Sequence, residues 1–215
     1  MTVRSFLLLG AAFALLAPFA FAADHYKVIP WSWADVTGDS GPKVSPTASS
    51  AQWVNKEGIT GMPGDHGLVI RKNVETAVYA SAGASFEGME DDVITAETTL
   101  GFTYRSDEYC TAGSPRFNVV ATDGVNKFYY FVGGCGNSAS TATVDGMWVT
   151  KTWTVPTSWF PVGSAPASPA GLTIVSVNII VDEGPAEAIL DAITYNTVTV
   201  GEPAAVVVKD NQDQD

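Results

Sequence analysis

Hydrophobic and polar residues alternate with a period of two along most of this chain, in stretches rich in Val, Thr, Tyr, Phe and Trp. A period of two places successive side chains on opposite faces, which is the pattern of β-strands. Gly and Pro separate the stretches, as expected for turns. The expected strands are residues 27–33, 67–71, 76–80, 97–105, 116–121, 127–133, 147–155, 174–182 and 190–200. No stretch has the period of a long amphipathic helix, although residues 185–190 could form one helical turn.

Many short strands separated by turns are typical of a β-sandwich or a barrel. We therefore predict an all-β fold: a two-sheet antiparallel sandwich of jelly-roll type with one disulfide. Within each strand the alternation separates a buried face from a solvated face. Leu100 and Phe102 are expected in the core, and so are Trp31 and Trp33, which share a face with Ile29.

The chain contains two cysteines, Cys110 and Cys135. In an exported chain such a pair most often forms a disulfide. Between them, Asp123-Gly124 separates two alternating runs, which predicts a β-hairpin of residues 116–121 and 127–133. We expect the preceding strand to complete a three-stranded meander with this hairpin, so that both cysteines lie at the same end of one sheet.

The two ends of the chain differ from the sequence between them. Residues 1–22 combine a positive charge at Arg4, an apolar run, a break at Pro18 and small residues, which predicts a secretory signal peptide. Residues 209–215 form a polar acidic tail that we expect to be disordered. Residues 23–208 suit a single β-sandwich domain. We expect a secreted protein, extracellular or periplasmic, with no membrane span in its mature chain.

The charge of the chain narrows the range of partners. Eleven basic and 23 acidic residues give a net charge of −12. A surface this acidic repels phosphate backbones, so we expect no nucleic acid partner.

Acidic residues gather near the strand ends. Glu87 begins a group that extends to Asp92, and Asp182 and Asp191 flank the last two expected strands. Oxygen ligands in loops are what Ca²⁺ prefers. We therefore take Glu87, Asp182 and Asp191 as candidate ligands of a structural calcium ion, and no cofactor is otherwise expected. The alternatives are solvated acidic loops and paired carboxylates of a glycosidase.

A second group of residues falls on the expected solvated faces: Arg105, Arg116, Asn118, Trp148 and, if the hairpin register allows, Tyr129. On one shared sheet these side chains would form a sugar-binding face, because aromatic rings stack on sugar C–H groups and planar polar groups bind hydroxyls. Two Arg could also select an acidic sugar. The alternative is that Trp148 packs under a loop and the Arg side chains pair with Asp107 or Glu108. Trp159-Phe160 is a second candidate platform, on a loop.

Two segments carry a resemblance to a known family. Val181-Asp182-Glu183-Gly184 followed by Leu190-Asp191-Ala192-Ile193 resembles the last two strands of jelly-roll (galactose-binding-like) carbohydrate-binding modules, with Ala192 in place of the usual Asn. Pro115-Arg116-Phe117-Asn118-Val119, before the Asp-Gly turn, resembles secreted bacterial proteins of unknown function. The first resemblance implies that Asp191 helps to hold structural calcium.

Three hypotheses for function follow. The first is a secreted binding module, not an enzyme, that recognises polysaccharide or cell-surface glycan. The second is a structural or adhesive cell-surface protein with protein partners, and the third is a secreted hydrolase that uses carboxylates. Gly38-Asp39-Ser40-Gly41-Pro42 resembles the nucleophile motif of trypsin-like serine proteases but lacks one Gly, and no partners occur in the expected order. No catalytic residue is therefore assigned.

Overall fold

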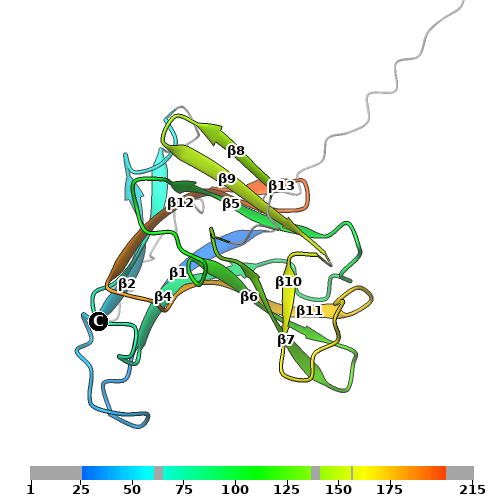
Figure 1. Ribbon diagram of the computed structural model, residues 1–215, viewed down its shortest axis with the longest axis horizontal. Helices are drawn as coiled ribbons and strands as arrows, with labels where there is room; N and C mark the ends of the chain where they lie inside the picture. The colour runs from blue at the N-terminus through cyan, green and yellow to red at the C-terminus, as the bar shows by residue number, and fades with distance from the viewer. Residues whose placement is uncertain (1–25, 61–64, 137–140, 156, 202–215) are drawn as a thin grey trace, which may run out of the picture.

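The computed structural model describes residues 26–60, 65–136, 141–155 and 157–201. The predicted signal peptide and acidic tail lie outside these residues. Within them the chain forms two antiparallel β-sheets packed face to face (Figure 1), which confirms the predicted all-β, two-sheet sandwich. The finer jelly-roll assignment stays a prediction. Among the described residues there is no helix long and apolar enough to cross a membrane.

Sheet A contains six strands, and β11 lies in the middle of it between strands that come much earlier in the chain. The order across the sheet is β1 (Lys27–Ala34), β4 (Ala80–Glu87), β11 (Thr173–Val181), β6 (Arg116–Thr122), β7 (Lys127–Gly133) and β10 (Trp159–Val162).

Sheet B is built in the same way, with β12 inserted between β3 and β5. Its order is β2 (Ser49–Asn55), β3 (His66–Lys72), β12 (Ala186–Tyr195), β5 (Thr99–Arg105), β9 (Trp148–Thr154) and β8 (Thr141–Asp145), and β13 (Val198–Val200) also pairs with β12.

The core lies between the two sheets and is rich in aromatic rings. Phe102 of sheet B packs 5.0 Å from Trp153 of the same sheet and 5.6 Å from Phe117 of sheet A, measured between ring centroids. All three side chains are fully buried, as is Leu100. Burial of each large side chain stabilises the fold by about 1.5–3 kcal/mol. The predicted core positions of Leu100 and Phe102 are thus confirmed.

Several strand predictions were wrong in detail. Residues 76–79 form a turn, and the strand β4 begins at Ala80. The expected helical turn at 185–190 is instead the start of β12. The strands β2, β8 and β10 were not predicted. Their sequences are short or rich in small and polar residues, so pairing with a neighbouring strand, rather than intrinsic propensity, makes them strands.

The hairpin and the disulfide are confirmed, but the meander is wrong. β6 pairs with β7 from Arg116↔Gly133 to Thr122↔Lys127, whereas β5 lies in sheet B. Cys110 and Cys135 form a disulfide with Cα atoms 5.4 Å apart. The bond therefore joins the loop that leaves sheet B after β5 to the loop that follows β7 in sheet A.

Candidate functional site

The outer face of sheet A begins with aromatic residues of β1 that were expected in the core. Val28 is the buried residue of this strand, while Ile29 and Trp33 are 41% and 48% exposed. The prediction was wrong because alternation defines two faces without saying which is buried. Trp31 is half-buried on the same outer face, where it lies opposite Gly83 of β4. A Cβ atom at Gly83 would come within 2.9 Å of the Trp31 indole, so the bare glycine lets the ring lie on the strand.

The other edge of the same face, on β7 and β10, also carries exposed aromatic residues. Tyr129 and Phe131 of β7 are 54% and 40% exposed, and Phe160 of β10, paired with Phe131, is 46% exposed. Six of the twelve exposed large apolar side chains among the described residues lie on this one face: Ile29, Trp33, Tyr129, Phe131, Phe160 and Val162. These residues form two groups on this face, one on β1 and one on β7 and β10.

Polar side chains lie between the two aromatic flanks, and they are already held in place. Arg116 forms a two-point ion pair with Asp182, with N–O distances of 2.8 and 2.6 Å. Its Nε donates to Asn118 Oδ1 at 3.0 Å, and its guanidinium lies 4.6 Å from the centre of the Phe131 ring. Asn178 of β11, directly opposite Asn118, accepts a hydrogen bond from Ser85 Oγ at 3.0 Å. The middle of the face is therefore a preorganised row of planar polar groups.

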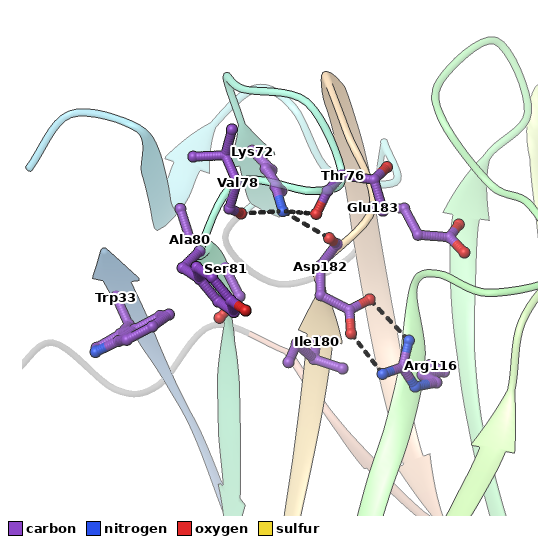
Figure 2. A pocket seen from close by; sticks show the side chains of 11 residues that line it. Trp33, Lys72, Thr76, Val78, Ala80, Ser81, Arg116, Ile180, Asp182 and Glu183 are labelled. Carbon is purple, nitrogen blue, oxygen red and sulfur yellow. Dashed lines mark hydrogen bonds and ion pairs between the residues drawn. The ribbon is translucent and has the colours of Figure 1, made fainter. Parts of the chain in front are cut away.

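Two hollows meet at Arg116. The first has a volume of about 430 Å³, and Figure 2 shows Trp33 on one side of it, Arg116 on the other and Ile180 between them. The second has a volume of about 450 Å³ and is lined by Gly113, Arg116, Phe131 and Phe160, among others. These volumes are within the usual range for ligand sites. Arg116 borders both hollows, and we refer to the two hollows together as the groove of sheet A.

Lys72 shapes one wall of the first hollow. Its side chain is 1% exposed, and its ammonium group donates to the backbone carbonyls of Thr76, Val78 and Asp182 at 3.0, 2.9 and 2.8 Å (Figure 2). Burial lowers the pKa of Lys72, and the charge of Asp182 opposes this effect. Lys72 thereby fastens the turn before β4 to the end of β11.

The five predicted sugar-binding residues do not share one sheet. Arg116, Asn118 and Tyr129 come together on the outer face of sheet A. Arg105 and Trp148 lie opposite each other in sheet B. Arg105 forms ion pairs with Glu57, Asp107 and Glu108, which agrees with the alternative interpretation of this side chain. Trp159, also named as a platform, is buried in β10 beside Tyr130, and only its neighbour Phe160 is exposed.

The three candidate calcium ligands lie apart. Asp182 pairs with Arg116, whereas Glu87 lies at the other end of sheet A. Asp191 is buried in sheet B and accepts hydrogen bonds from the backbone N–H groups of Ile59 and Ala192. Burial raises the pKa of Asp191, and these two hydrogen bonds oppose the rise. In the described part of the chain no three His, Cys, Asp or Glu side chains form a group that could hold a metal ion.

The sequence contains signals for some of the residues that were missed. Phe131 lies two positions after Tyr129, so the same parity places both on one face. Trp31 and Trp33 share one parity with Ile29, but the sequence does not say that this parity faces outward, because both faces of β1 carry apolar residues. Asn178 and Ser85 carry no such signal, because they meet Asn118 only through the insertion of β11.

Comparison with known proteins adds no relative: no protein-family model, curated protein or solved structure matched the chain.

Proposed function

We propose that this protein is a secreted, non-catalytic module that binds polysaccharide or cell-surface glycan on the outer face of sheet A. The observation that carries the proposal is the arrangement of this face. Exposed aromatic rings lie on both flanks of this face, and the Arg116–Asp182 pair lies between them in the groove, with Asn118 beside it.

This arrangement suits the two kinds of surface that a sugar presents. The C–H face of a pyranose is apolar and stacks on aromatic rings such as Trp33 and Phe131. Its hydroxyl groups lie around the edge, where Asn118 and Asn178, whose Oδ1 atoms already accept hydrogen bonds from Arg116 and Ser85, offer their amide N–H groups. Because the polar side chains are already fixed by hydrogen bonds to one another, binding orders few of them, which lowers its entropic cost.

The first test is binding of the purified protein to a broad glycan panel, with Trp33→Ala and Phe131→Ala as variants. Each truncation removes one aromatic flank, so we expect each to weaken binding by about tenfold or more. Trp33 and Phe131 are 48% and 40% exposed, so we expect both variants to fold with a modest loss of stability, and thermal melting separates that loss from the loss of binding. Isothermal titration with the best glycan of the panel measures the affinities.

A matched control is Val144→Ala, which truncates an exposed apolar residue of β8 in sheet B and should leave binding unchanged. Trp148→Ala distinguishes the two sheets. If this variant loses binding while Trp33→Ala and Phe131→Ala keep it, the site lies on sheet B. If the wild-type protein binds no glycan of the panel, the proposal is contradicted, and an adhesive protein with protein partners is favoured.

A further inference from the structure

We infer that the ligand of the outer face of sheet A is an uncharged polysaccharide, an inference that rests on the proposed function. Two Arg side chains in the sequence suggest the opposite, an acidic sugar. The structure separates the two, because Arg105 lies in sheet B and only Arg116 reaches the groove. Whether the groove attracts an acidic sugar therefore depends on the groups that surround Arg116.

Four of the five N–H donors of Arg116 form hydrogen bonds within the protein itself. Both terminal nitrogens bind the Asp182 carboxylate, one of them also binds the backbone carbonyl of Gly113, and Nε binds Asn118. A carboxylate or sulfate on a sugar could form a two-point ion pair with Arg116 only by displacing Asp182, which belongs to the same chain and holds that position in the free protein. Such a displacement exchanges one ion pair for another, so it brings no net attraction.

The other cations of this face offer no substitute. Lys72 borders the first hollow, but its buried ammonium group binds three backbone carbonyls. Lys27 lies opposite Glu87, and Lys127 lies beside the hairpin turn; both are at the far end of the strands from Asp182. Within the described part of the groove, positive charge is thus either paired or buried.

The charged residues that border the first hollow, Lys72, Arg116, Asp182 and Glu183, sum to zero formal charge, and Glu183 adds a carboxylate beside the Arg116–Asp182 pair. Glu183 accepts hydrogen bonds from Tyr109 and Thr111 at 2.9 and 2.7 Å. The whole chain carries a net charge of −12, so its long-range field also repels a polyanion. What the groove offers a ligand is aromatic surface and neutral hydrogen-bonding groups, and this combination selects uncharged sugars.

The ligand is also a chain rather than a single sugar. One aromatic flank lies on β1, at one edge of a six-stranded sheet, and the other lies on β7 and β10, at the opposite edge. At about 4.8 Å between neighbouring strands, β1 is about 19 Å from β7 and about 24 Å from β10. One pyranose ring cannot contact both flanks, so we expect an oligosaccharide that crosses the strands.

The test compares neutral polysaccharides (β-glucan, xylan and galactomannan) with acidic ones (polygalacturonate and alginate) by affinity electrophoresis at low and high salt. We expect binding within the neutral set, with little change on addition of salt, because no unpaired charges are involved. Binding should also be stronger for oligosaccharides than for the corresponding monosaccharide.

Two variants of equal net charge test whether the Arg116–Asp182 ion pair, rather than the net charge of the protein, prevents binding of acidic sugars. Asp182→Asn removes the partner of Arg116, so we expect this variant to gain binding to polygalacturonate that high salt suppresses. Glu183→Gln changes the net charge by the same amount but leaves the Arg116–Asp182 pair intact, so we expect no such gain. Thermal melting identifies any variant that fails to fold. In that case, the comparison of neutral and acidic polysaccharides with the wild-type protein tests the ligand assignment.

The outcomes separate the two proposals. If the wild-type protein binds acidic polysaccharides more tightly than neutral ones and salt weakens the binding, the ligand assignment is wrong and the glycan-binding function stands. An equal gain in both variants would also overturn the assignment, because it would trace the effect to net charge rather than to Arg116. If no polysaccharide binds, both proposals fail together.

Discussion

Lys72 is a buried cation that connects three segments of the chain. Its ammonium group binds carbonyls of the turn before β4 and of the end of β11, while its own backbone belongs to β3. Lysine is rarely buried unless its charge is paired. Here partial charges of three backbone carbonyls replace a carboxylate partner, so the side chain acts as a structural link between the two sheets.

We expect Lys72→Met to lower the free energy of unfolding by about 3 kcal/mol, because the buried carbonyls lose their donor. Urea denaturation measures the change. Lys127→Met, at an exposed position on β7, is the control and should change stability little. Equal stabilities of the two variants would show that the Lys72 hydrogen bonds do not hold the turn.

Asp35 has a comparable role in the loop after β1. Its carboxylate accepts hydrogen bonds from the backbone N–H groups of Gly38, Asp39 and Ser40 at 2.8, 3.0 and 2.8 Å. These hydrogen bonds, led by that of Ser40, lower the pKa of Asp35 below its ordinary value of 3.8, although burial opposes them. The stretch that resembles a protease nucleophile motif is thus a loop folded around a carboxylate.

This pKa shift predicts how the stability depends on pH. A carboxylate with a lowered pKa in the folded state stabilises the protein above its ordinary pKa, and the contribution is lost as the pH falls through the folded value. We expect Asp35→Asn to lower the melting temperature at neutral pH. The difference from the wild-type protein should shrink below about pH 4. A difference that stays constant down to pH 2 would rule out the carboxylate as its source.

The sequence could predict some residues of the site and not others. Parity alone places Arg116 and Asn118 on one face, because they lie two positions apart on one strand. Parity could not decide whether Trp33 faces the core or the solvent, since both faces of β1 carry apolar residues. A buried lysine such as Lys72 looks like any solvated lysine until its neighbours are known.

At the scale of single elements, local signals predicted the hairpin and failed at strands that depend on their neighbours. Asp123-Gly124 fixes the turn between β6 and β7 by its own backbone preferences. β4, in contrast, consists largely of Ala, Ser and Gly, which have little β propensity. β4 is a strand because its backbone approaches β11 closely: a Cβ at Gly83 would lie 1.9 Å from the Ile179 carbonyl oxygen.

The disulfide is an element whose removal can be tested directly. It closes a loop with a sequence separation of 25 residues, and the chain-entropy model gives such a bond about 3 kcal/mol. We expect the double variant Cys110→Ser, Cys135→Ser to lose that much stability in chemical denaturation. The wild-type protein treated with a reducing agent serves as the comparison and should move in the same direction. Unchanged stability in both would show that loop packing alone suffices.

At the scale of the whole molecule, the sequence predicted the class of fold but not the assignment of strands to sheets. Every strand of a sandwich has one buried face, so β5 and β6 show the same alternation although they belong to different sheets. This is why the predicted binding residues divided between the sheets. The partners of each strand depend on long-range contacts, for which a single sequence carries no local signal.

The position of β11 determines when, during growth of the chain, the outer face of sheet A is completed. One flank of the groove stands on β1, next to β4, and the other stands on β7 and β10, next to β6; β11, at residues 173–181, connects the two groups. During synthesis, both flanks emerge before the strand that joins them. A chain that stops short of residue 173 therefore carries two separate parts of this face, and the continuous outer face of sheet A forms only when β11 is inserted between β4 and β6.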